Sequence, residues 1–64
     1  MPEKSVRDML VAKVDELIDM TSRDLDEIRA VTEQLEPDRA QSCRTALAMT
    51  ATMLDEIKLR AHAP

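Results

Sequence analysis

Glycine and aromatic residues are both absent from this sequence. Without glycine, the tight hairpin turns that need positive φ angles become costly, and without aromatic side chains a β-sheet core loses much of its usual bulk. Ala, Leu, Met, Glu and Arg are abundant instead, and they are strong helix formers. The 64 residues therefore predict a small all-α protein.

Cysteine and histidine each occur once, at Cys43 and His62. A lone cysteine cannot form an internal disulfide, and a lone histidine cannot supply a zinc-type ligand cluster within one chain. We expect Cys43 to be a structural thiol rather than a reactive one, and His62 either to interact with the last carbonyl groups of a helix or to lie in a frayed helix end. No cofactor, metal site or catalytic residue is predicted. A chain this short usually needs a disulfide, a metal or a partner subunit for stability. Because a disulfide and a metal cluster are not predicted within one chain, we expect a partner subunit.

Long apolar runs are also missing. No stretch approaches the roughly 18 residues that span a bilayer, and the first residues lack the apolar segment of a signal peptide. We therefore expect a cytoplasmic protein with no membrane contact. The net charge is −4, and an acidic protein repels nucleic-acid phosphates unless its basic residues gather on one face.

One internal proline, Pro37, divides the chain. A residue before proline avoids the α region, so Glu36 should leave the helix, whereas proline is well placed as the first residue of the next one. Ser5 and Asp8 have the spacing of an N-terminal capping box. The sequence predicts a single domain over residues 1–64, with a helix over about 5–35, a turn at 36–37 and a helix over about 38–62.

Apolar residues recur at steps of three and four in both segments, which predicts two heptad seams. The first seam comprises Leu10, Val14, Leu17, Thr21, Asp24, Ile28, Val31 and Leu35, and it is widened by Val11, Ile18 and Leu25. The second comprises Ala40, Cys43, Leu47, Thr50, Leu54, Ile57 and Ala61. When the chain folds back at Glu36, the two seams fall into register, from Leu35 opposite Ala40 to Val14 opposite Ala61. The pattern predicts an antiparallel helical hairpin.

A break inside the first helix is the alternative. The segment from Thr21 to Asp24 is poor helix material, and it scans as a capping box of its own. A break there would give three shorter helices. The heptad phase runs through the segment without a skip, which favours a continuous helix.

Residues 45–54 carry no charged side chain, although 34% of all residues are charged. A helix that buries one stripe exposes charged residues in every turn, so this segment should be packed on more than one side. Two hairpins would cover it by pairing into a dimeric four-helix bundle. The residues that we expect at this interface are Ala46, Met49, Thr50, Met53 and Leu54.

Asp24 interrupts the first seam. A buried carboxylate is costly unless it is paired and hydrogen-bonded. Thr21 and Thr50 are placed to form a polar layer with it, and such a layer would set the register of the bundle. The alternatives are a ligand or metal site lined by two symmetry-related Asp24 carboxylates, and a side chain that turns outward to solvent.

In length and layout the chain resembles Rop, a plasmid-encoded helical hairpin that dimerises into a four-helix bundle. The resemblance implies a Rop-like architecture. Rop binds RNA hairpins through polar and basic residues of one helix pair, whereas the outward positions of the first helix here include Asp19, Asp26 and Glu33. The stretch 36–58 is also similar to the second dimerisation helix of some sensor histidine kinases, but the first helix has no histidine to accept a phosphoryl group.

The sequence thus predicts a non-enzymatic, homodimeric module for protein–protein interaction: an adaptor, a regulator or a small accessory subunit that recruits another protein. The alternative is a Rop-like regulator that binds nucleic acid. For that function the basic residues would have to gather into one strip across the dimer, namely Arg23 and Arg29 or Arg39, Arg44, Lys58 and Arg60. An enzyme would need Asp24 and carboxylates of the second chain to hold a metal.

Overall fold

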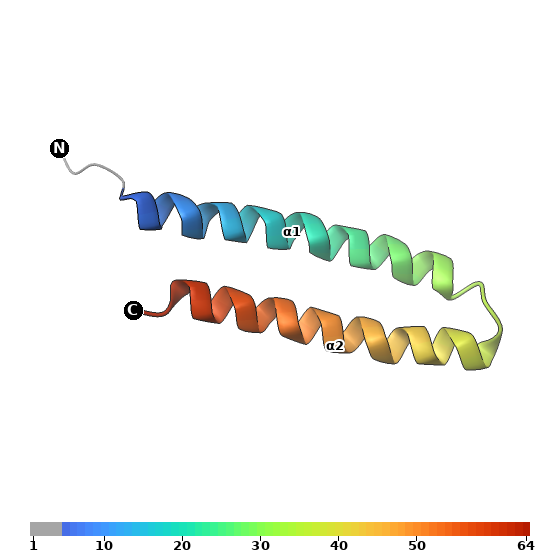
Figure 1. Ribbon diagram of the computed structural model, residues 1–64. Coiled ribbons are helices and arrows are strands. Elements are labelled where there is room, and N and C mark those ends of the chain that lie inside the picture. Colours follow the sequence, from blue (N-terminus) through green and yellow to red (C-terminus); the bar gives the residue numbers. More distant parts are fainter. Residues whose placement is uncertain (1–4) are drawn as a thin grey trace.

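The computed structural model describes residues 5–64, which form two helices joined by a short turn (Figure 1). Helix α1 spans Val6–Thr32 and helix α2 spans Pro37–His62. They run antiparallel along each other in a hairpin whose principal dimensions are 57 × 19 × 10 Å. The predictions of an all-α fold and of a helical hairpin are confirmed.

Both helix starts have the local cause that the sequence indicates. At α1 the backbone N–H of Asp8 donates to the side-chain oxygen of Ser5 over 3.1 Å, which satisfies one of the unpaired amides of the first turn. At α2, Glu36 is extended with ψ of 148°, and Pro37 is the first helical residue.

The end of α1 differs from the prediction. The helix stops at Thr32 rather than near residue 35. The amides of Gln34 and Leu35 donate to the carbonyls of Val31 and Thr32, both over 3.1 Å, so the chain tightens into i→i−3 bonds before it reaches Glu36.

Helix α1 is continuous through the segment in which a break was the alternative. The hydroxyl of Thr21 donates to the carbonyl of Leu17 over 2.7 Å. This bond occupies the Thr21 side chain within the helix, so it does not cap a new helix start there.

The two helices meet along one line of residues on each, which we call the facing lines. The facing line of α1 comprises Val11, Ile18, Leu25 and Thr32, and that of α2 comprises Ala40, Leu47, Leu54 and Ala61. All eight are buried or half-buried, and within each line they follow a seven-residue spacing.

The seam predicted for α2 contains its facing line, but the seam predicted for α1 does not. Leu10, Leu17 and Val31 are 62%, 49% and 65% exposed, whereas Ile18 is only 8% exposed. Each residue advances about 100° around a helix, so a shift of one position corresponds to a rotation of α1 by that angle. As a result, α2 packs against Val11, Ile18 and Leu25, which were expected only to widen the seam.

The hairpin encloses very little. Ile18, Ala40 and Leu47 are the buried hydrophobic residues of the described chain. The accessible surface is 5476 Å², whereas size scaling gives about 4,100 Å² for a compact monomer of 7.2 kDa. Most of the hydrophobic surface of both helices therefore remains uncovered in the single chain.

Candidate interaction surface

The hairpin has two unlike faces, one on each side of the facing lines. Helix geometry assigns each neighbouring residue to one side of the facing line. On the first side, about 60–100° away, are the residues one position before or three positions after a facing-line residue. On the second side are the residues one or four positions after it. Asp15 and Glu33 of α1 are on this second side, and they pair with His62 and Arg44 of α2. These contacts show that the second sides of both helices form one face, which we call the ion-pair face.

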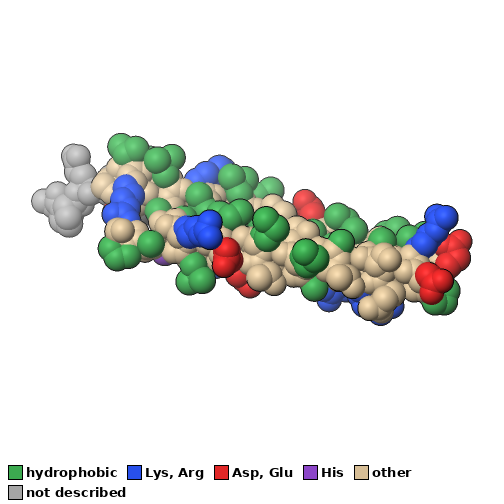
Figure 2. Space-filling view, turned by 60° about the horizontal axis from the view of Figure 1, so that its bottom comes forward, with side chains coloured by type: hydrophobic (Ala, Val, Ile, Leu, Met, Phe, Trp, Pro, Cys, Tyr) green, Lys and Arg blue, Asp and Glu red, His purple; other side chains and the backbone are tan. Residues whose placement is uncertain are grey.

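The opposite side is then also shared by both helices, and we call it the apolar face. Its members in α1 and the turn are Leu10, Val14, Leu17, Thr21, Asp24, Ile28, Val31 and Leu35, and in α2 they are Cys43, Ala46, Thr50, Met53 and Ile57, with Arg39 and Arg60 at its two ends. Val14 is half-buried, and the other large hydrophobic side chains on it are 44–65% exposed. Hydrophobic side chains recur along the whole length of the molecule in Figure 2. The entire seam predicted for α1 lies here, to one side of its facing line.

The residues expected at a subunit interface divide between two positions. Ala46, Met49, Thr50 and Met53 are exposed, with Met49 at 64% and Met53 at 65%. Leu54 is half-buried because it belongs to the facing line of α2. The first four are thus open to a partner, and Leu54 contacts α1.

The three residues expected in a polar layer do not bond to one another in the single chain. The hydroxyl of Thr50 donates to the carbonyl of Ala46 over 2.9 Å, and that of Thr21 donates to its own helix. Asp24 is exposed, and it lines a surface hollow of about 530 Å³ with Glu27, Ile28, Val31 and Thr32. A polar layer stays a prediction for the assembled protein.

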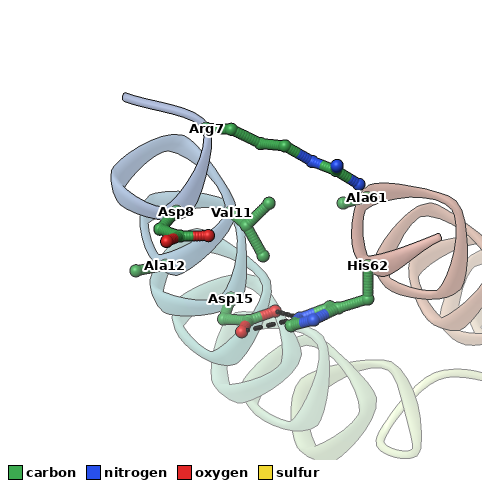
Figure 3. A pocket seen from close by; sticks show the side chains of 7 residues that line it. All are labelled: Arg7, Asp8, Val11, Ala12, Asp15, Ala61 and His62. Carbon is green, nitrogen blue, oxygen red and sulfur yellow. Dashed lines mark hydrogen bonds and ion pairs between the residues drawn. The ribbon is translucent and has the colours of Figure 1, made fainter. Parts of the chain in front are cut away.

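His62 takes part in a contact that the sequence analysis missed. Its Nε2 lies 2.9 Å from each carboxylate oxygen of Asp15, at the open end of the hairpin (Figure 3). A carboxylate only accepts, so this ring nitrogen must carry the proton. The predicted register places Val14 opposite Ala61, and Asp15 and His62 are the residues that follow these two. The register was therefore the signal from which the Asp15–His62 contact could have been predicted.

The Asp15–His62 pair borders a shallow hollow of about 300 Å³. The Arg7 side chain reaches across it from α1 (Figure 3). Its guanidinium donates to the carbonyl of Ala63. These contacts tie the last turn of α2 to α1. The hollow lies at the point where the ends of the two helices brace each other.

Glu33 and Arg44 brace the other end of the ion-pair face. Arg44 donates from Nε and Nη2 to the two carboxylate oxygens of Glu33 over 2.6 and 3.1 Å. This two-point hydrogen bond, together with the charge of Arg44, holds the pKa of the Glu33 carboxyl below its ordinary value of 4.5 and raises the pKa of Arg44.

Metal and membrane sites find no support in the described residues. No three His, Cys, Asp or Glu side chains of residues 5–64 lie close enough together to hold a metal ion. Cys43 is half-buried in α2. Neither helix is long and apolar enough to cross a membrane.

Comparisons with known proteins yield no match to a family model, to a curated protein or to a solved structure. The function must therefore be inferred from the two faces themselves.

Proposed function

We propose that this protein is a non-enzymatic, homodimeric module for protein–protein interaction, in which the apolar faces of two hairpins pack together into a four-helix bundle. The observation that carries the proposal is the segregation of side chains. The ion-pair face bears the Glu33–Arg44 ion pair and the Asp15–His62 hydrogen bond, and the apolar face bears large hydrophobic residues that no other part of the described chain covers. Contiguous exposed apolar surface of this kind is typical of a protein–protein contact.

The area supports a second copy as the covering element. The chain exposes about 1,400 Å² more than a compact monomer of its mass would, by size scaling. A standard interface removes roughly 800 Å² from each partner, so the surplus is large enough for one. An isologous interface is self-complementary, and a hairpin with one apolar face can bury it against the same face of another copy.

The ion-pair face and the outward side of α2 would stay accessible in such a dimer. They carry polar and charged groups that suit recruitment of another protein, as expected of an adaptor or an accessory subunit. The nucleic-acid alternative has less support, because Arg39, Arg44 and Arg60 each lie within 4.0 Å of a carboxylate: Glu36, Glu33 and Glu56. Paired guanidinium groups contribute less to the release of counterions from a phosphate backbone.

Sedimentation equilibrium tests the proposal directly. At micromolar concentration we expect twice the chain mass of 7.2 kDa. A mass of 7.2 kDa for the wild-type protein would contradict it.

Two substitutions in α2 provide a matched comparison. Met53 is on the apolar face and 65% exposed, whereas Leu59 is 72% exposed and lines a hollow with Asp55, Lys58 and His62 elsewhere on the helix. Met53→Glu should dissociate the dimer, because the new carboxylate would have to be desolvated. Leu59→Glu should leave the mass unchanged. Equal effects of the two changes would mean that the apolar face is not the interface.

A further inference from the structure

The outward stripe of the apolar face on α1 is evenly spaced. Within the helix it runs through Leu10, Leu17, Asp24 and Val31, in steps of seven residues. The centre of this stripe lies between Met20 and Thr21. When a second copy of the stripe is turned end for end about that centre, Leu10 lies opposite Val31 and Leu17 lies opposite Asp24.

Charged residues on the outer edge of the same stripe are centred half a residue away, at Met20. Lys13 and Glu27 are seven residues to either side of Met20. Both lie two positions after a facing-line residue, which places them beyond the stripe on the side of α1 away from α2. Lys13 is 60% exposed at its side chain, and its partner within the chain is Glu16, at 3.4 Å.

A surface hollow occupies the position that Lys13 of a second copy would reach. It is lined by Asp24 and Glu27 together with Ile28, Val31 and Thr32. Two carboxylates and an apolar floor suit a lysine, whose methylene stem packs on hydrophobic surface while its ammonium group meets the charges. This hollow also gives the exposed Asp24 carboxylate a cationic neighbour in the dimer.

We propose that the two copies associate with their α1 helices side by side and antiparallel, so that Lys13 of each copy enters the hollow formed by Asp24 and Glu27 of the other. This inference rests on the proposed homodimer and specifies its arrangement. The turns of the two hairpins then lie at opposite ends of the bundle. A bundle with α1 beside the partner's α2 would not bring Lys13 and Glu27 together.

Charge reversal with mixing tests the arrangement. Lys13→Glu places two acidic groups opposite each other at both sites of its homodimer, and Glu27→Lys places two basic groups there. Each should weaken self-association about ten- to hundredfold, because an attraction becomes a repulsion twice per dimer. A heterodimer of the two variants restores opposite charges at both sites. Native mass spectrometry of an equimolar mixture, with one variant isotopically labelled, should then show predominantly heterodimer.

The control mixture combines Asp26→Lys with Lys58→Glu, which reverse charges on the ion-pair side of α1 and α2. It should give the statistical distribution of homodimers and heterodimers. Circular dichroism should show unchanged helicity for all four variants, because each substituted side chain is exposed. In 1 M salt the heterodimer preference should shrink as the charges are screened.

Failure of this inference is distinguishable from failure of the proposed function. A statistical distribution from the Lys13→Glu and Glu27→Lys mixture, with a dimeric wild type, would overturn the antiparallel α1 arrangement alone. A monomeric wild type would overturn both.

Discussion

At the scale of single residues, Arg44 makes a two-point hydrogen bond with Glu33 across the two helices. The two-point geometry is of the kind that makes an Arg–carboxylate pair specific as well as attractive. Both side chains are partly exposed, 40% and 46%, so solvent screens the pair and its contribution to stability is modest. Its structural effect is to fix which side of α1 faces which side of α2 near the turn.

Glu33 gives the protein a predictable response to acid. The pKa of Glu33 is lowered on folding, so its contribution to stability is fully present above the ordinary value of 4.5 and is lost as the pH falls through the folded value. We expect the melting temperature of the wild type to exceed that of Glu33→Gln at neutral pH, and the difference to vanish in strong acid. Thermal melts between pH 7 and pH 2 would measure it.

Arg44→Gln supplies the control for that measurement. When Glu33→Gln is added to the Arg44→Gln variant, it should no longer change the pH dependence of the melting temperature, because the hydrogen bond that lowers the pKa of Glu33 is gone. A difference between wild type and Glu33→Gln that persists unchanged in strong acid would show that the pair does not stabilise the fold as described.

At the scale of elements, the two helices have unequal surfaces. Helix α1 alternates hydrophobic and acidic stripes, whereas residues 45–54 of α2 are uncharged on every side. Helix α1 covers only the facing line of that segment, where Leu47 is 8% exposed. The absence of charge on the remaining sides predicts that another protein surface covers α2 as well.

Met49→Glu tests this prediction for α2. Met49 is 64% exposed at the outer edge of the apolar face. A purely solvated position would tolerate the change within about 0.5 kcal/mol. In the proposed dimer the carboxylate must be desolvated at a cost of several kcal/mol, so we expect dissociation in a sedimentation experiment.

Thr52→Glu is the matched variant in the same uncharged segment. Thr52 is exposed on the outward side of α2, away from the facing line and the apolar face. The Thr52→Glu substitution should leave the dimer intact. An unchanged dimer with Met49→Glu as well would mean that a second copy does not cover this part of α2.

At the scale of the whole molecule, the hairpin is long, thin and sparsely cored. A two-helix layer of 57 × 19 × 10 Å has almost no interior, which is why three residues account for the buried hydrophobic core of residues 5–64. Small chains reach useful stability by adding a disulfide, a metal or a partner. The proposed dimer turns the apolar face into a core shared by four helices.

Folding of such a dimer should depend on concentration. A thermal melt followed by circular dichroism should shift to higher temperature as the protein concentration rises, because association is linked to the folded state. A tenfold dilution series measures the shift. A melting temperature that does not change across the series would indicate that the hairpin folds and persists as a monomer.

The sequence by itself determined that the chain forms two helices and that the turn between them ends at Pro37. Pro37 and the extended Glu36 before it act through local sterics, and the Ser5 cap acts through one hydrogen bond, so neither depends on distant residues. The register of the hairpin follows from matching heptads. The observed pairs Asp15–His62 and Glu33–Arg44 lie within one or two residues of the predicted layers.

Only the tertiary structure decided how α1 is turned about its own axis. Its hydrophobic stripe is wide enough for two neighbours, and periodicity does not assign either edge of a stripe to a particular neighbour. Placing Ile18 rather than Leu17 against α2 brings Asp15 and Glu33 within hydrogen-bonding distance of His62 and Arg44. The remaining edge, with Leu17 and Asp24, is thereby left facing outward, because one helix can cover only one side of another.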